Sequence, residues 1–109
     1  RLKLEMKSFL KTRKAINFDL SENLLKKYYP SIHYRNAWRD IKIYLESNDF
    51  RHRQYSGYVS KGYMSMSDVG NIIIGMAEYY SWLGLCVQQL DVTIVGNEYS
   101  FISRIKINN

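Results

Sequence analysis

The sequence contains few of the residue types from which metal centres and disulfides are made. Among 109 residues there are one cysteine and two histidines, which excludes an intramolecular disulfide and a zinc site built from several cysteines. A single cysteine is typical of a protein kept in a reducing compartment, so we expect a cytoplasmic location. No apolar run approaches the ~18 residues of a membrane-spanning helix, so no membrane span is expected.

The signatures of several enzyme classes are also absent. The chain has no phosphate-binding loop, no G-x-G-x-x-G dinucleotide fingerprint, no G-x-S-x-G turn and no H-E-x-x-H zinc helix. A cysteine–histidine nucleophile would need Cys86 beside His33 or His52. Cys86 lies in an apolar stretch, and this setting favours a buried core cysteine over a reactive one.

Positive charge is plentiful but unevenly distributed. Sixteen Lys and Arg residues against ten Asp and Glu residues give a formal charge of +6. Counted along the chain, residues 1–14 carry +5, residues 15–25 carry −2, residues 26–61 carry +5 and residues 62–109 carry −2. Clustered bases attract polyanions such as RNA. They also form the solvated faces of ordinary helices and hairpins, and charge alone leaves both interpretations open.

Hydrophobic spacing predicts one α+β domain at residues 14–109, preceded by a basic N-terminal extension, residues 1–13, with the spacing of an amphipathic helix. The predicted elements are a strand at 14–20, a helix from Ser31 to about Asn48, strands at 50–54 and 58–60, a helix begun by a Ser65–Asp68 capping box, a strand at 89–95, and an extra strand at 98–105 after a Gly96–Asn97 turn. This is the βαββαβ order of the ferredoxin-like fold, in which both helices cover one face of an antiparallel sheet.

The other face of such a sheet has no helix to cover it. The chain contains ten tyrosines and four phenylalanines, and we expect those on the strands to be exposed on this face. A second copy of the chain is the simplest cover, so a homodimer is predicted. In a basic protein, exposed tyrosines also suit the bases of single-stranded RNA.

Three basic residues and one acidic residue are candidates for a site. Arg51 and Arg53 alternate on one face of the second strand, and beside Lys61 they form a group that can hold phosphate; hairpin solubility is the alternative. Asp19 ends the first strand, where a carboxylate can bind a metal ion or orient a nucleophile. It can equally cap the following turn, and the spacing leaves both roles open.

Several segments, taken in order, resemble the virulence-associated protein D family. They are KAINFDL at 14–20, NAWRDIKIYLESNDF at 36–50, QYSGYVS at 54–60, GMAEYYSWL at 75–83 and QLDV…EYSFISRIK at 89–106. The resemblance implies a small dimeric endoribonuclease with a ferredoxin-like fold, acting as the toxin of a toxin–antitoxin system on single-stranded or messenger RNA, with a small antitoxin protein as a partner. The alternatives are a non-catalytic RNA-binding module and a protein-interaction dimer of the same fold.

The same resemblance implies roles for individual residues. Asp19 matches the strand-end aspartate of the family's F-D-L, which makes it the candidate catalytic residue and the candidate ligand of a Mg²⁺ cofactor. Gln54, Ser56 and Tyr58 match the family's Q-x-S-x-Y hairpin, which implies RNA binding by Gln54 and catalysis by Ser56 and Tyr58. Family members more often read Q-G-S, whereas here Tyr55 follows Gln54. Cleavage can proceed through metal-activated water or through attack by the ribose 2′-OH, and the sequence does not choose between them.

Overall fold

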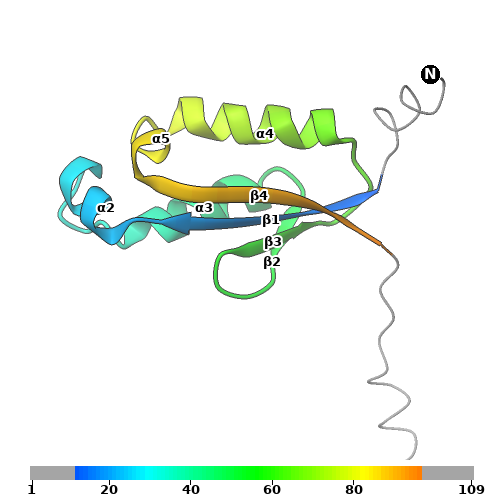
Figure 1. The fold of residues 1–109 in the computed structure, drawn as a ribbon, viewed down its shortest axis with the longest axis horizontal. Coiled ribbons are helices and arrows are strands. Elements are labelled where there is room, and N and C mark those ends of the chain that lie inside the picture. The colour runs from blue at the N-terminus through cyan, green and yellow to red at the C-terminus, as the bar shows by residue number, and fades with distance from the viewer. Residues whose placement is uncertain (1–11, 97–109) are drawn as a thin grey trace, which may run out of the picture.

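The computed structural model describes residues 12–96. Their helices and strands, in chain order, are β1 (Arg13–Leu20), α2 (Glu22–Tyr28), α3 (Asn36–Glu46), β2 (Phe50–His52), β3 (Gly57–Ser60), α4 (Met66–Tyr79), α5 (Leu83–Cys86) and β4 (Val87–Val95) (Figure 1). The four strands form one antiparallel sheet in the order β2-β3-β1-β4. The predicted α+β class and antiparallel sheet are therefore confirmed.

Two predicted segments lie outside the described residues. These are the amphipathic helix of the N-terminal extension, except for its last two residues, and the extra strand at 98–105 with the Asn97 half of its turn. The predicted boundary after residue 13 needs a correction within the described part. Arg13 is the first residue of β1, and Thr12 already pairs with Met64 through an isolated bridge.

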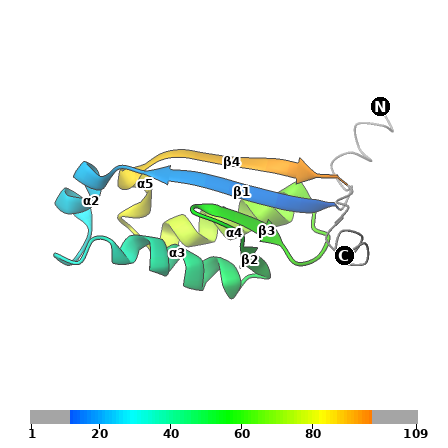
Figure 2. The same ribbon diagram turned by 90° about the horizontal axis from the view of Figure 1, so that it is seen from below.

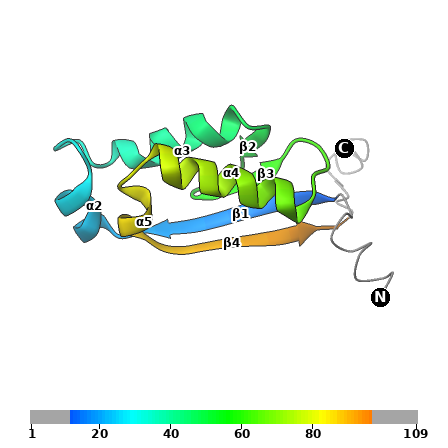
Figure 3. The same cartoon turned by 90° about the horizontal axis from the view of Figure 1, so that it is seen from above.

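One face of the sheet is buried under the helices. In β1 the buried residues are Lys14, Ile16, Phe18 and Leu20, and they alternate with residues on the opposite face. Helices α3 and α4 cover the buried face with Ala37, Ile41, Leu45, Val69 and Met76. The strands stand in front of α4 in Figure 2, and α4 stands in front of the sheet in the opposite view of Figure 3. We call the two sides of the sheet the helix face and the open face.

The strand aromatics lie on the helix face, which corrects the sequence expectation. Phe18, Phe50 and Tyr58 are buried members of the core. The alternation along each strand correctly predicts that aromatic and polar residues lie on opposite faces of the sheet. It does not predict which face the helices cover, because that depends on where the apolar residues of the helices pack. Within residues 12–96, the strands therefore present no aromatic residues on the open face for a second copy of the chain to cover. A homodimer stays a prediction that rests on the resemblance.

The N-terminus of helix α4 forms as predicted. The Ser65 hydroxyl accepts a hydrogen bond from the Asp68 N–H at 3.0 Å, and the Asp68 carboxylate accepts one from the Ser65 N–H at 3.0 Å. This capping box satisfies two backbone N–H groups that the first helical turn leaves without partners. Cys86 is buried in the core at the end of α5, as the apolar stretch predicted.

Helix α3 is shorter than predicted. It begins at Asn36 rather than after Ser31, because Ser31 closes a turn instead of capping a helix. Its hydroxyl accepts a hydrogen bond from the His33 N–H at 3.0 Å. Tyr34 therefore precedes the helix and packs at the edge of the core. Serine's affinity for nearby backbone N–H groups serves turns and caps alike, so the residue type alone could not decide.

One lysine of the basic N-terminal part of the sequence is buried in the fold. Lys14 is only 1% exposed, and its Nζ donates hydrogen bonds to the Met64 carbonyl at 2.8 Å and to Thr12. Burial lowers the pKa of this ammonium group, although the negative charge of Asp68 opposes the effect. Lys14 therefore joins the start of β1 to the loop before α4 and is not available to an external phosphate.

Two glycines of α4 give a prediction about the packing of the helices. A Cβ at Gly70 would meet nothing within 4 Å, whereas a Cβ at Gly75 would stand 2.8 Å from the Tyr44 hydroxyl of α3. Alanine is favoured over glycine in a helix by about 1 kcal/mol. We expect Gly70→Ala to raise the thermal midpoint by about 4–8 °C. Gly75→Ala should gain less or lower it, because the Tyr44 ring is already packed against Tyr79 and Tyr80. Equal gains for the two variants, measured by thermal unfolding, would contradict this account.

None of the helices within residues 12–96 is long and apolar enough to cross a membrane.

Candidate functional site

The open face carries polar and charged side chains. In β1 it presents Arg13, Asn17 and Asp19, which alternate with the buried residues. Residues that stand opposite each other in neighbouring strands point to the same face of a sheet. The register therefore adds these residues to the open face: Arg51 and Val59, paired with each other; Gly57 and Asp91, both opposite Asn17; and Gln89, opposite Asp19. The sequence between 12 and 96 thus builds an amphipathic sheet.

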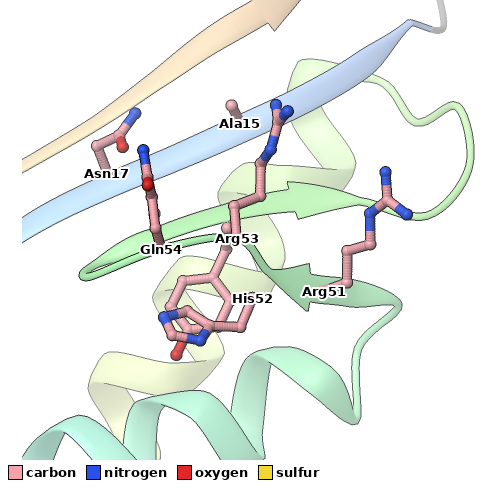
Figure 4. Close-up of a pocket in the computed structure, with 8 residues that line it drawn as sticks. Ala15, Asn17, Arg51, His52, Arg53 and Gln54 are labelled. Carbon is pink, nitrogen blue, oxygen red and sulfur yellow. The ribbon is translucent and has the colours of Figure 1, made fainter. Parts of the chain in front are cut away.

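Two adjoining hollows lie on this side of the molecule. The larger one, of about 740 Å³, is lined by Ala15, Asn17, Arg51, His52, Arg53, Gln54, Gly57 and Tyr58 (Figure 4). The smaller one, of about 480 Å³, is lined by Asn17, Phe18, Asp19, Gln54, Tyr55, Ser56, Gly57 and Gln89. Asn17, Gln54 and Gly57 belong to both. The two hollows therefore adjoin on the open face, and we refer to them together as the open-face groove.

The fold brings most of the predicted site residues to this groove. Arg51, Arg53 and Gln54 line its larger part, and Gln54 also lines the smaller part together with Asp19 and Ser56. These residues come from three segments of the chain, and β3 joins the hairpin to β1 by antiparallel pairing. In Figure 4 the side chains of Asn17, Gln54 and Arg53 extend over the sheet on the same side. The groove therefore places cationic side chains at one end and a carboxylate at the other.

Lys61 does not join this group, which corrects the expected cluster of three bases. It follows the end of β3 and lines neither part of the groove. Its backbone N–H donates to the Asp49 carbonyl at 2.8 Å, and Asp49 adopts a positive φ of 65°. The chain turns at this point, so the alternation that puts Arg51 and Arg53 on one side of the hairpin does not extend to Lys61.

Tyr58 borders the groove but belongs to the core. Its residue is only 2% exposed, and it stands opposite the buried Ile16 on the helix face. Its ring centroid lies 6.1 Å from that of Phe18 and 4.8 Å from that of His52. Burial, and then the negative charge of Glu46, raise the pKa of the Tyr58 hydroxyl to about 12. This setting opposes proton release, so it gives no support to the expected catalytic role if Tyr58 acts as a base.

We expect Tyr58→Phe to keep the stability of the protein at neutral pH and to weaken its alkaline sensitivity. The folded-state pKa of about 12 lies above the ordinary value of about 10. The protonated hydroxyl therefore stabilises the folded state fully below about pH 10, and this stabilisation is lost as the pH rises to about 12. Thermal midpoints measured across this interval should fall less in Tyr58→Phe than in wild type. An equal fall in both would show that other groups cause it.

Asp19 is exposed at the carboxyl end of β1. The cap of the next helix is Ser21, whose hydroxyl accepts a hydrogen bond from the Leu24 N–H at 3.2 Å. Among residues 12–96, no donor is hydrogen-bonded to the Asp19 carboxylate. The turn-capping role weighed for Asp19 is therefore wrong. The carboxylate is free to meet a ligand.

Ser56 lines the groove without the surroundings of a serine nucleophile. Its side chain is half-buried, and its backbone carbonyl accepts a hydrogen bond from the Phe18 N–H at 3.3 Å. Within the described part of the chain, no histidine or lysine is hydrogen-bonded to its hydroxyl. An activated serine needs such a base. Ser56 is therefore placed to contact a ligand rather than to attack it.

Two polar groove residues escaped the sequence analysis, and one further acid lies close to them. Asn17 and Gln89 line the groove, as does His52, which the sequence analysis considered only as a partner of Cys86. Asp91 stands opposite Asn17, and its carboxylate accepts a hydrogen bond from Gln89 Nε2 at 2.6 Å. The alternation in the strand at 89–95 could have pointed to Gln89 and Asp91, because Leu90 and Val92 on the helix face imply that their neighbours lie on the open face. Its pairing partner could not be known beforehand.

The groove offers a magnesium ion one uncommitted carboxylate. In residues 12–96 there is no group of three or more His, Cys, Asp or Glu side chains that could hold a metal ion. Mg²⁺ is often bound by one or two carboxylates together with substrate phosphates and water. Asp19 fits that minimal role when a phosphate supplies the remaining ligands, and a permanently bound ion is not indicated.

The sequence was compared with protein-family models and with curated proteins. No protein-family model matches the chain, and no curated protein is significantly similar to it. The resemblance to the virulence-associated protein D family therefore rests on the motifs described above.

Proposed function

We propose that the protein is an endoribonuclease that binds single-stranded RNA in the open-face groove. One observation carries the proposal: Asp19 shares the groove with Arg51 and Arg53, although the two segments are far apart in the sequence. Arginine binds phosphate through charge-assisted, often bidentate hydrogen bonds. A carboxylate beside bound phosphate can serve either chemical route of RNA cleavage, as a base or as a metal ligand.

The arrangement suggests how RNA is held. Arg51 and Arg53 are exposed side chains of the hairpin, and they can contact consecutive phosphates of an extended strand. Asn17 and Gln54 stand between the arginines and Asp19, and their amides can both donate and accept hydrogen bonds. The 2′-OH of the ribose also donates and accepts, which favours RNA over DNA at such a surface.

Asp19 can act in two ways. As a base, it accepts the proton of a ribose 2′-OH while that oxygen forms a bond to phosphorus; the bond from phosphorus to the 5′-oxygen breaks, and the leaving oxygen takes a proton from water. As a ligand, the Asp19 carboxylate would hold Mg²⁺ together with the RNA phosphate, and the chemistry so supplied would be activation of water and neutralisation of charge. Both routes need only the one exposed carboxylate of Asp19, so the two are separated by experiment.

Cleavage of labelled single-stranded RNA by the purified chain, with and without a chelator, tests the proposal. The base route predicts chelator-resistant cleavage and products ending in a 2′,3′-cyclic phosphate. The metal route predicts chelator-sensitive cleavage without a cyclic phosphate. RNA that is bound but never cut would contradict the enzymatic proposal under both conditions.

A non-catalytic RNA-binding protein is the second candidate. It is favoured by the environment of Ser56, because no described histidine or lysine is hydrogen-bonded to that hydroxyl. Binding needs only the cationic and amide side chains of the groove, whereas cleavage also needs Asp19. The two candidates therefore make different predictions for a variant that lacks the Asp19 charge: only an endoribonuclease would show a slower rate of RNA cleavage.

The wider setting of the proposal comes from the resemblance. The strand order β2-β3-β1-β4, with one helical segment between β1 and β2 and another between β3 and β4, agrees with a ferredoxin-like fold. A homodimer, a small antitoxin partner, a toxin role and a cytoplasmic location remain predictions. Light scattering across a range of concentrations tests the first of these, since a mass of 13.0 kDa throughout would mean a monomer.

A further inference from the structure

The tip of the β2–β3 loop presents an exposed aromatic ring. Tyr55 is 90% exposed, the highest value among the large hydrophobic residues of the described chain. Its backbone has a positive φ of 51°. A side chain other than that of glycine rarely adopts this conformation, because its Cβ crowds the following carbonyl. The loop therefore keeps a bulky residue at a position where glycine would be less strained.

The strain is held by hydrogen bonds on both sides of Tyr55. The Gly57 N–H donates to the Gln54 carbonyl at 2.9 Å, and the Arg53 N–H donates to the Gly57 carbonyl at 2.9 Å. His52 Nε2 is hydrogen-bonded to the Tyr55 carbonyl at 2.5 Å. The His52 ring in turn lies against Tyr58, so the loop is connected to the core.

Packing gives no reason for the tyrosine. No ring or cation of residues 12–96 is in aromatic or cation–π contact with Tyr55, whereas Tyr29, Tyr44, Tyr58 and Tyr80 all pack against other rings. Backbone strain that the surrounding structure maintains without a packing benefit is found at binding sites. An exposed ring on a firmly held loop is well suited to stacking, because little backbone freedom is lost on binding.

The position of the ring indicates what would stack on it. Tyr55 lines the smaller part of the groove together with Asp19 and Ser56. Gln54, the residue before it, lines both parts of the groove and so connects this end with Arg51 and Arg53. A strand whose phosphates lie along the arginines would bring its next base to the loop tip.

We propose that Tyr55 is a stacking platform for one unpaired base of single-stranded RNA, beside the phosphate held in the open-face groove. This inference rests on the proposed function and adds the residue that binds a base of the single strand. A base can lie on the ring only when it is free of the stack and pairing of a duplex. The platform selects single strands, and it accepts any base because each has a π-face.

The test is RNA binding by the full chain, followed by fluorescence anisotropy. The probe is a labelled 2′-O-methyl oligoribonucleotide of about eight nucleotides, within the range of known single-strand sites, which resists cleavage. A second probe is an abasic ribose-phosphate chain of the same length and charge. The variants are Tyr55→Gly and Tyr55→Phe, with Tyr63→Ala as the matched control. Tyr63 is another exposed tyrosine, at 72%, and it lines neither part of the groove.

We expect Tyr55→Gly to bind the oligonucleotide roughly tenfold more weakly, with a thermal midpoint at or above that of wild type because glycine accepts the positive φ. Tyr55→Phe and Tyr63→Ala should bind like wild type. The abasic chain should bind wild type and Tyr55→Gly equally. Unchanged affinity of Tyr55→Gly, or an equal loss on both probes, would overturn the inference alone. Failure of wild type to bind either probe would instead overturn the proposed function.

Discussion

Replacing Asp19 by asparagine should lower the rate of RNA cleavage about a hundredfold or more while leaving stability unchanged. The amide has nearly the shape of the carboxylate but cannot accept the 2′-OH proton or bind a cation as tightly. Asp19 is exposed, and within residues 12–96 nothing donates a hydrogen bond to it. The substitution therefore breaks no contact of the described fold, so a loss of activity would report on chemistry. Initial cleavage rates and thermal midpoints of both proteins make the comparison.

Asp91→Asn is the matched control for this experiment. Asp91 lies on the same face and carries the same charge, but its carboxylate is already hydrogen-bonded to Gln89. Removing either acid raises the net charge of the protein by the same amount. If only the overall charge mattered, the two variants would behave alike. Full activity of a folded Asp19→Asn protein would remove Asp19 from the site and make the non-catalytic RNA-binding interpretation the first choice.

The double substitution of Arg51 and Arg53 by alanine should weaken RNA binding by about tenfold or more, with a loss that shrinks as salt is added. Both side chains are exposed and line the larger part of the groove. Each phosphate contact with a single strand contributes roughly 0.7 to the slope of log K against log salt concentration. Two lost contacts should therefore flatten that slope by roughly 1.4. Titrations of a labelled oligonucleotide at several salt concentrations measure both quantities.

The matched control here is the double substitution of Lys26 and Lys27 by alanine. These exposed lysines lie in the last turn of α2 and line neither part of the groove. Replacing these lysines removes the same amount of positive charge from another place on the molecule. Equal losses for the two double variants would mean that RNA responds to net charge rather than to this groove. Thermal midpoints must accompany the binding data, because Arg53 also interacts within the protein.

Local patterns in the sequence determined a good part of this protein. The alternation in KAINFDL defined β1 and put Asp19 on the opposite face from Phe18. The Ser65–Asp68 pair marked the start of α4, and the apolar stretch around Cys86 marked a buried segment. Each of these features depends on residues within a few positions of one another. Strand periodicity and helix capping act at that range, so they can be recognised without knowing the rest of the fold.

The tertiary structure alone decided which of these residues meet. Tyr58 became a core residue because its strand pairs with β1 so that Tyr58 stands opposite Ile16. The same pairing put Arg53 and Asp19 along one groove, while β4 brought Asp91 opposite Asn17. Register depends on contacts between segments far apart in the chain, and a shift of one residue would exchange the faces of a strand. Patterns within a single segment cannot specify those contacts, because their energies arise only when the sheet and its helices pack together.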